Sequence, residues 1–465
     1  MTSTTTNPTG PLGLEGPLGL DELRGAVADG RVDTVIVAFT DMQGRLVGKR
    51  VSARLFLEDV AEHGAECCNY LLAVDVEMNT VDGYAISSWE RGYGDMRMVP
   101  DFTTLRMAPW LPGTAMVTAD LEWLDGSPVE ESPRRILQRQ VARLAERGLV
   151  PYSGNELEFI VFEDDYRSAW RSGYRDLTPA SDYNVDYALH ASTRMEPLLR
   201  DIRLAMDGAG MYTEGVKGEC NLGQQEIAFR YAPSVTTCDN HSIYKSGAKE
   251  IADAHGKSIT FMAKFDQREG NSCHIHLSLR GTDGGAVFAD DGDPDGMSPL
   301  FRGFLGGLVA HLRSLTLLLA PNVNSYKRYV DGSFAPTALA WGFDNRTCAL
   351  RVVGHGSGLR VECRIPGGDV NPHLATAALI AAGLAGIDEG LEAGPAFVGN
   401  AYQSDAPRVP TTLRDAAALF EASDLARAAF GADVVAHYLN NARVEVAAFD
   451  AAVTDWERVR GFERL

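Results

Sequence analysis

The sequence lacks a membrane-spanning run, a cysteine framework and an excess of positive charge. The most apolar long segment, 305–320, is interrupted by His311 and Arg313, whereas a spanning helix needs about 20 mostly apolar residues. The seven cysteines form no C-x-x-C pair, so we expect neither a disulfide framework nor a cysteine zinc site. Lys and Arg number 43 against 63 Asp and Glu, a net charge of −20, which argues against nucleic-acid and membrane binding.

The N-terminal residues also lack the basic start and apolar stretch of a signal peptide. Together with the scattered cysteines, this predicts a cytoplasmic protein in a reducing compartment. The composition, 45% apolar and 23% charged, is typical of a globular protein with a large core.

The 465 residues suffice for two or three domains of about 150 residues each. We expect a flexible tail over residues 1–17, a small α+β domain over 18–122 and a larger domain over 123–465. Within the small domain, β-branched runs at 32–39 and 47–51 flank turn residues and predict a β-hairpin.

Helices are expected mainly in the larger domain. Ser132 and Pro133 are typical of a helix start, and Gly148 of the residue beyond its end. Longer helices are predicted over residues 193–209, 240–261 and 299–319 and in the Ala-rich part after residue 372.

Three predicted strands carry charged residues on one face. In 154–160, the period of two places Glu156 and Glu158 on the same side, about 7 Å apart, where two carboxylates need a compensating cation. In 274–279, the polar face carries His274, His276 and Ser278. A solvated sheet face is the alternative for any one of these strands.

The third strand, 360–365, alternates Arg360, Glu362 and Arg364 with apolar residues. Between the first two strands lies a turn rich in glycine and amides that is bracketed by Glu219 and Glu226. Carboxylates with one histidine suit Mg²⁺ or Mn²⁺. Further arginines in the same half suit phosphoryl transfer from a nucleotide, which depends on charge neutralisation and positioning; they are Arg328, Arg346 and Arg351.

These motifs, in this order, resemble those of the glutamine synthetase superfamily over about residues 20–465. The matching segments are 155–159 (NELEF), 218–226, 273–278 (CHIHLS), 324–328 (NSYKR), 345–346 and 360–366. The resemblance implies an α+β fold, with a small N-terminal β-grasp-like domain and a large catalytic domain whose curved antiparallel sheet is flanked by helices. It also implies a homododecamer of stacked hexameric rings with active sites between subunits.

The resemblance further implies a two-step reaction. ATP phosphorylates the γ-carboxylate of L-glutamate, and an amine then attacks the acyl phosphate, with two or three Mg²⁺ or Mn²⁺ ions per site. The implied ligands are Glu158, Glu219 and Glu226 for one ion, and Glu156, His274 and Glu362 for the other. The implied ATP contacts are His276, Ser278, Arg346 and Arg351. The implied glutamate contacts are Gly270, Arg328, Arg346 and Arg364, with Arg328 and Arg346 also catalytic.

The sequence departs from the family pattern around the amine. Residues 82–89 resemble the ammonium-binding loop, and Asp82 is present, but Tyr84 and Ala85 replace two serines. Phe334 stands where ammonia-using members carry a flap glutamate. An aromatic ring accepts no proton but packs on carbon or stacks on an ammonium group, so an organic amine is favoured. Asp82 is the candidate base, and Tyr183 is expected to line the amine pocket.

Three smaller departures from the family pattern affect the nucleotide site, the glutamate site and the region that is modified in regulated members. Ser357 replaces a basic nucleotide contact, and Glu269 replaces an asparagine beside the glutamate site. The surroundings of Tyr402 are unlike the modification site of members regulated by adenylylation.

Residues 74–78, the Phe334 flap and the C-terminal 456–463 resemble the γ-glutamylpolyamine synthetase branch. The expected activity is therefore ATP-dependent ligation of glutamate to an organic amine. A polyamine such as putrescine, used in polyamine catabolism, is favoured over a small monoamine such as ethanolamine. Ordinary glutamine synthetase and a non-catalytic homologue are the alternatives.

Overall fold

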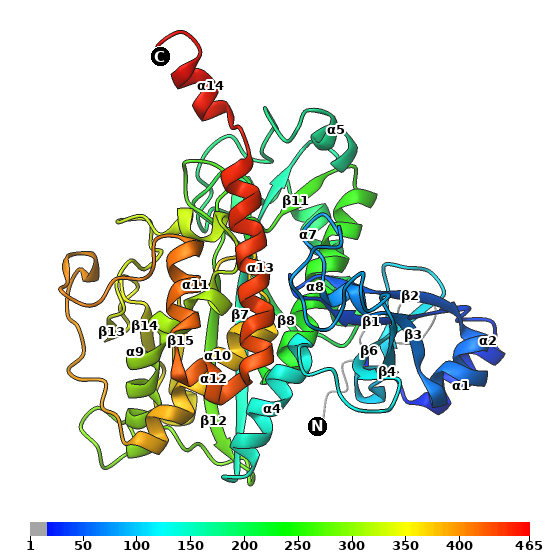
Figure 1. Ribbon diagram of the computed structural model, residues 1–465, viewed down its shortest axis with the longest axis horizontal. Helices are drawn as coiled ribbons and strands as arrows, with labels where there is room; N and C mark the ends of the chain where they lie inside the picture. The colour runs from blue at the N-terminus through cyan, green and yellow to red at the C-terminus, as the bar shows by residue number, and fades with distance from the viewer. Residues whose placement is uncertain (1–15) are drawn as a thin grey trace.

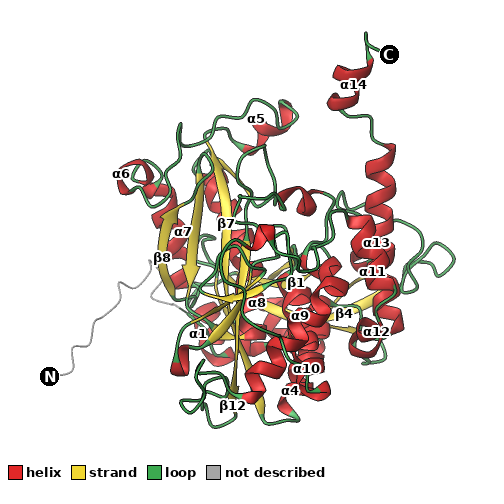
Figure 2. Cartoon of the chain, turned by 90° about the vertical axis from the view of Figure 1, so that its left-hand side faces the viewer, coloured by secondary structure: helices red, strands yellow, loops and turns green. Residues whose placement is uncertain are grey.

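The computed structural model describes residues 16–465. The predicted tail, residues 1–17, therefore lies outside the described residues except for Gly16 and Pro17, and the backbone N–H of Gly16 donates to the Gly208 carbonyl at 2.8 Å. A smaller sheet, blue at the right of Figure 1, lies beside a larger body in which helices cover a long sheet. Figure 2 shows the long strand β7 (Leu149–Phe162) running through that body.

The smaller sheet is mixed, in the order β2-β1-β6-β4-β3, with β5 on β6. Its strands are β1 (Thr34–Thr40), β2 (Leu46–Ser52), β3 (Ala65–Cys68), β4 (Asp95–Pro100), β5 (Arg106–Met107) and β6 (Thr114–Trp123). The predicted hairpin is confirmed: β1 and β2 pair antiparallel. The Asp41 carboxylate closes its turn by accepting from the backbone N–H groups of Gln43 and Arg45 at 3.0 and 2.8 Å.

The larger sheet has the order β13-β14-β15-β12-β7-β9-β8, with β10 and β11 also on β7. Its other strands are β8 (Thr213–Gly218), β9 (Gln224–Phe229), β10 (Ala232–Pro233), β11 (Ser258–Thr260), β12 (Cys273–Gly281), β13 (Trp341–Phe343), β14 (Leu350–Val353) and β15 (Arg360–Cys363). The sheet was expected to be antiparallel, but β13 and β14 run parallel at its edge. The side-chain alternation that reveals a strand is the same for either direction.

The α-helices lie beside both sheets, with the first ones in the chain beside the smaller sheet (Figure 1). They are α1 (Leu20–Ala28), α2 (Ala53–Leu55), α3 (Ala61–His63), α4 (Pro133–Ala145), α5 (Tyr166–Arg171), α6 (Leu189–Ser192), α7 (Glu196–Gly208), α8 (Ser234–Ala254), α9 (Pro299–Leu319), α10 (Pro372–Glu389), α11 (Leu413–Glu421), α12 (Asp424–Phe430), α13 (Ala432–Ala451) and α14 (Asp455–Gly461). The helix predicted over 240–261 is wrong at its C-terminal end. Gly256, with φ +66°, follows α8, and the chain then enters β11.

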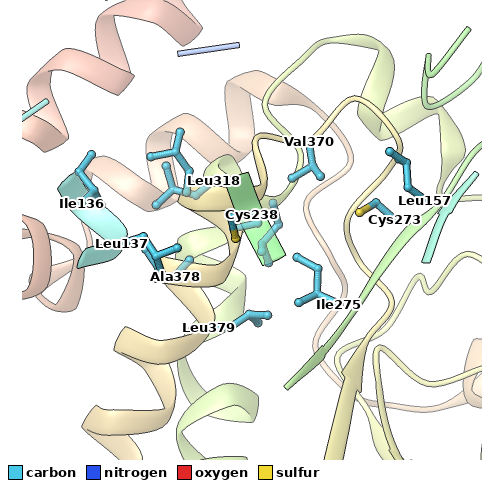
Figure 3. Close-up of a cluster of buried hydrophobic side chains, with 14 of the residues drawn as sticks. Ile136, Leu137, Leu157, Cys238, Cys273, Ile275, Leu318, Val370, Ala378 and Leu379 are labelled. Atoms are coloured by element: carbon cyan, nitrogen blue, oxygen red, sulfur yellow. The ribbon is translucent and has the colours of Figure 1, made fainter. Parts of the chain in front are cut away.

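The main core lies between the larger sheet and α4, α8, α9 and α10 (Figure 3). Helix α10 is apolar on all sides and buried along nearly its whole length, as expected for a helix enclosed by other elements. Cys273 and Cys363 alternate with the charged residues of their strands, which directs their side chains away from the polar face, and both are buried in this core.

A buried arginine joins the two parts of the molecule. Arg134, at the start of α4, pairs with Asp120 of β6 at 2.6 Å and with Asp101, just after β4, at 2.7 Å. It also pairs with Asp239 of α8 at 3.0 Å. Moving the two parts of the molecule relative to each other would break these ion pairs and leave a buried charge uncompensated, which is costly. The network therefore holds the smaller sheet against the larger body.

Within residues 16–465, no helix combines the length and apolar character that a membrane crossing needs.

Candidate active site

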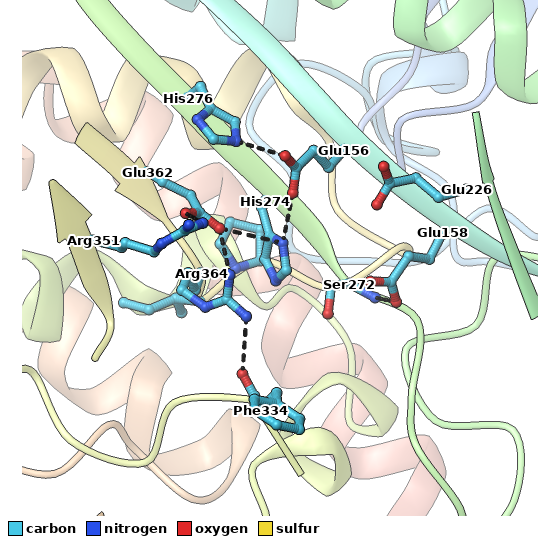
Figure 4. A network of polar contacts seen from close by, with 12 residues as sticks. Glu156, Glu158, Glu226, Ser272, His274, His276, Phe334, Arg351, Glu362 and Arg364 are labelled. Atoms are coloured by element: carbon cyan, nitrogen blue, oxygen red, sulfur yellow. Dashed lines mark hydrogen bonds and ion pairs between the residues drawn. The ribbon is translucent and has the colours of Figure 1, made fainter. Parts of the chain in front are cut away.

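Sheet pairing brings the three predicted charged strands together. Strand β12 lies between β7 and β15, with His274 opposite Glu156 and His276 opposite Glu362. On the other side of β7, Glu158 faces Glu226 of β9. Residues far apart in sequence therefore form one polar surface, on which two clusters are distinguished (Figure 4).

The first, the carboxylate cluster, consists of Glu158, Glu219 and Glu226, whose ligand atoms lie within 4.8 Å of one another. A Glu158 oxygen accepts from the Ser272 backbone N–H at 2.7 Å and from Gln224 Nε2 at 2.9 Å, which orients its carboxylate. Burial and the charges of Glu156 and Glu158 raise the pKa of Glu226 to about 8. Glu226 therefore loses its proton near neutral pH only when a cation compensates the charge, and the cluster has the oxygen donors and the spacing to hold one.

The second, the histidine cluster, consists of Glu156, His274, His276 and Glu362. One Glu156 oxygen lies 3.0 Å from His274 Nδ1, and the other lies 2.9 Å from His276 Nε2. Glu362 lies 3.5 Å from His274. Glu156, His276 and Glu362 also offer ligand atoms within 4.8 Å of one another. The structure thus places His276 among the possible metal ligands, whereas the sequence had suggested only a nucleotide contact.

Protonation in the histidine cluster follows from burial and neighbouring charge. Burial opposes ionisation of Glu156, but hydrogen bonds from His274 and His276 outweigh it and lower the pKa of Glu156. Burial and the Arg364 charge lower the pKa of His274. A neutral His274 keeps a lone pair for a metal, and within residues 16–465 its buried Nε2 has no hydrogen-bond partner.

Two arginines contact Glu362. Arg351 Nη1 donates to Glu362 at 2.7 Å, and its Nε donates to Asp344 at 3.0 Å. Arg364 also donates to Glu362, and its Nη2 lies 3.4 Å from the carbonyl oxygen of Phe334 (Figure 4). Arg364 therefore connects the histidine cluster to the flap segment.

Arg328, expected to contact the substrate glutamate, is instead buried with its guanidinium bonded to other groups of the protein. It is 2% exposed, and its guanidinium donates to Ser272 Oγ at 3.1 Å and to the backbone carbonyls of residues 364–366. A substrate carboxylate would reach Arg328 only by exchanging with these contacts. Gly270 packs against it: a Cβ there would lie 2.9 Å from Arg328 Cγ and 2.1 Å from the Ala263 carbonyl oxygen, which favours glycine at this close approach.

A cavity of about 320 Å³ opens beside the histidine cluster and is lined in part by the predicted nucleotide contacts His276 and Ser278. Its lining includes three residues that the sequence analysis missed. They are Tyr152, Tyr231 and Arg280, with the two rings 6.0 Å apart and the Arg280 guanidinium 5.9 Å from the Tyr152 ring. Tyr152 could have been found, because it precedes Glu156 by four residues in β7 and so shares its face.

Ser357, the departure from a basic nucleotide contact, also lines this cavity, where its carbonyl accepts from Arg280 at 3.2 Å. At the other departure, the Glu269 carbonyl accepts from Asn221 at 2.7 Å. Arg346 is exposed and lines a separate shallow pocket of about 390 Å³ with Phe343 and Val398. The Tyr402 side chain is mostly buried.

The Asp82 loop is held by the C-terminal part of the chain. Asn440 of α13 donates to the Asp82 carbonyl at 2.9 Å. Tyr84 is buried, with its ring centroid 4.7 Å from that of His437. Within residues 16–465, no hydrogen bond or ion pair joins Asp82 to either cluster of the same chain. The tyrosine that replaces a family serine thus anchors this loop to α13.

The buried His437 predicts an acid-dependent loss of stability. Burial lowers its pKa to about 3, from 6.5. Below pH 6.5 the unfolded chain takes up a proton at His437, whereas the folded protein does not. The contribution of His437 to the free energy of unfolding is therefore fully present above pH 6.5 and is lost as the pH falls toward 3. Between pH 7.5 and 5, this group should lower the free energy of unfolding by about 2 kcal/mol.

Urea unfolding at both pH values tests this expectation. His437→Leu should lose less stability than the wild type on acidification, whereas His63→Leu, at an exposed histidine, should behave as the wild type does. An equal loss in both variants would assign the acid sensitivity to other groups.

The two aromatic residues proposed for the amine pocket are both accessible. Tyr183 is 49% and Phe334 55% exposed. Phe334 has a φ of +58°, a left-handed conformation that is costly for a bulky residue. The carbonyl contact with Arg364 helps to hold this flap conformation.

Comparison with known proteins gives consistent matches. The model of the glutamine synthetase catalytic domain matches residues 130–460. A γ-glutamylethanolamide synthetase of Streptomyces coelicolor is 62% identical over 449 residues, 97% of this chain and 96% of the relative. A glutamate–isopropylamine ligase of a Pseudomonas species is 34% identical over 444 residues, 94% of this chain and 97% of the relative. A solved complex of GmaS with ADP has a TM-score of 0.83 and 30% identity, and the match covers 95% of this chain and 99% of that one.

The fold and these matches define an ATP-dependent ligase that forms carbon–nitrogen bonds. The chain belongs to the glutamine synthetase family. The resemblance inferred from the six ordered motifs is therefore confirmed, as is the catalytic fold. The β-grasp description of the smaller sheet, the domain boundaries and the site roles stay predictions.

Proposed function

We propose that this protein joins the γ-carboxylate of L-glutamate to ethanolamine, with cleavage of ATP to ADP and phosphate. The observation that carries the proposal is the 62% identity to a γ-glutamylethanolamide synthetase along 97% of the chain. Both curated relatives reported above are named for an organic amine, which agrees with Phe334 in the flap. The sequence alone favoured a polyamine; the small monoamine, its second choice, is now preferred.

The two clusters would hold the divalent ions. The carboxylate cluster offers only oxygen ligands and the histidine cluster adds imidazole nitrogen, a donor set that fits Mg²⁺ or Mn²⁺. When bound, such ions neutralise phosphate charge and orient the nucleotide. The role of the chain is to present the carboxylates at fixed spacing on neighbouring strands, with Ser272 and Gln224 orienting Glu158.

The first step transfers the terminal phosphoryl group of ATP to a γ-carboxylate oxygen of glutamate, giving γ-glutamyl phosphate and ADP. The cavity beside His276 and Ser278 would take the nucleotide. Arg346 and Arg351 would neutralise charge on the transferred group, and Arg364 would bind glutamate after releasing the Phe334 carbonyl. Arginine suits these roles because its planar donors match carboxylate and phosphate oxygens.

In the second step, the amine nitrogen attacks the γ-carbonyl carbon, phosphate leaves, and a proton passes to a base. Ethanolamine is protonated near neutral pH and must lose a proton before it attacks. Asp82 is the proposed base. Because it contacts neither cluster of its own chain, we propose that it acts in the site of a neighbouring subunit, in an oligomer of stacked hexameric rings. The free cysteines are consistent with a cytoplasmic enzyme.

An amine panel tests the proposal. Purified protein with ATP, Mg²⁺ and glutamate is assayed for phosphate release with ethanolamine, ammonium, isopropylamine, putrescine and spermidine, and the products are identified by mass spectrometry. We expect the highest kcat/KM for ethanolamine, with γ-glutamylethanolamide as the product. A preference for putrescine would restore the polyamine prediction, and a preference for ammonium would indicate an ordinary glutamine synthetase.

A further inference from the structure

A lysine of the same sheet occupies the position of a cation in the carboxylate cluster. Lys217 in β8 is the cross-strand partner of Glu226 in β9, so their side chains share one face. The Lys217 ammonium group forms an ion pair with Glu219 and lies 3.4 Å from a Glu226 oxygen. It thus contacts two of the three carboxylates whose spacing suits a divalent ion.

The surroundings of this ammonium group make the contact stronger than an ordinary surface ion pair. The side chains of Lys217, Glu219 and Glu226 are only 27%, 16% and 6% exposed. Partial burial reduces solvent screening, which is what makes exposed pairs weak. The Tyr187 ring, with its centroid 5.2 Å from Lys217 Nζ, offers the ammonium group a second favourable contact.

We propose that Lys217 is a built-in cation that competes with the divalent ion for the carboxylate cluster. Without the ion, its positive charge holds the cluster's carboxylates together. When the ion binds, Lys217 leaves Glu219 and keeps its contact with Tyr187 and solvent. This inference rests on the assignment of the cluster as a metal site under the proposed function.

Competition has two linked consequences. The lysine stabilises the metal-free protein, because it offsets repulsion among Glu158, Glu219 and Glu226. It also weakens ion binding by the same free energy, because the ion must displace it. Removing the charge while keeping the length of the side chain should therefore change both properties, in opposite directions.

The test compares Lys217→Met with the wild type after removal of metal with EDTA. Mn²⁺ binding is measured by calorimetry and by the electron paramagnetic resonance signal of free Mn²⁺, and stability is measured by thermal unfolding without metal. Lys217→Met should bind its first Mn²⁺ about tenfold more tightly and should unfold at a lower temperature when metal-free.

Two further variants keep the test decisive. Lys257→Met makes the same change in an ion pair with Glu163, outside both clusters, and should match the wild type in both measurements. Lys217→Arg retains the charge and should bind Mn²⁺ as the wild type does. If Lys217→Met folds only with Mn²⁺, its affinity is measured on the loaded protein by withdrawing Mn²⁺ with a chelator, and the wild type is treated in the same way.

The outcomes separate the inference from the proposed function. If the wild type binds no Mn²⁺, the metal assignment fails. If it binds Mn²⁺ but Lys217→Met changes neither affinity nor metal-free stability, or changes only one of them, the competition is overturned while the metal assignment stands. Lys217→Arg binding Mn²⁺ as tightly as Lys217→Met would likewise overturn it, because charge would then be irrelevant.

Discussion

Replacing Glu219 by Gln should lower ligase turnover by at least about a hundredfold, with little loss of folded protein. Glu219 belongs to the carboxylate cluster and is the partner of Lys217. An amide is nearly the same size as a carboxylate but carries no charge, so the cluster would lose part of its affinity for a divalent ion. Phosphate release with ATP, glutamate and ethanolamine measures the effect.

The matched control for this change is Glu163→Gln, which alters the carboxylate that pairs with Lys257 outside both clusters. Its activity should equal that of the wild type. Circular dichroism and the melting temperature establish that both variants fold. A folded Glu219→Gln enzyme with wild-type turnover would show that the carboxylate cluster is not a catalytic metal site.

Replacing Phe334 by Glu should shift the amine preference from ethanolamine toward ammonium. The carboxylate would attract an ammonium ion and accept its proton, whereas the apolar contact with the carbon chain of ethanolamine would be lost. Removing such a contact changes discrimination by at least about tenfold. The measurement is the ratio of kcat/KM for ethanolamine to that for ammonium.

Phe334→Leu is the control for this prediction because it keeps an apolar side chain at the same position. Both substituents have a Cβ, so both meet the strained left-handed backbone at φ +58°, and a difference between them reports on side-chain chemistry. Phe334→Leu should still prefer ethanolamine. If Phe334→Glu kept the wild-type ratio, the flap residue would not determine amine choice.

Local patterns predicted the strands and their faces well. The alternation in 154–160 and 274–279 placed Glu156, Glu158, His274 and His276 on the polar face, and pairing of β7 with β12 puts His274 opposite Glu156. The end of α8 was missed, because apolar residues continue past Gly256 into β11. Periodicity alone does not tell a helix from a short buried strand that follows it.

The roles of the arginines were harder to predict. Arg328 and Arg364 had the same implied task, yet Arg328 is buried against backbone carbonyls, whereas Arg364 bridges Glu362 and Phe334. Nothing in the segment 324–328 reveals that the carbonyls of residues 364–366, just after β15, will surround the guanidinium. Which groups accept the hydrogen bonds of a buried guanidinium depends on which segments of the chain meet in space.

The sequence by itself determined the family and the ligase class and indicated candidate metal ligands, because ordered motifs and a period of two are local properties. Only the tertiary structure decided which charges meet. It placed Lys217 on the carboxylate cluster, His276 beside Glu156, and the Asp82 loop on α13 through Asn440 and Tyr84. These contacts join strands and helices distant along the chain, and their energies depend on burial and distance, which the order of residues does not express.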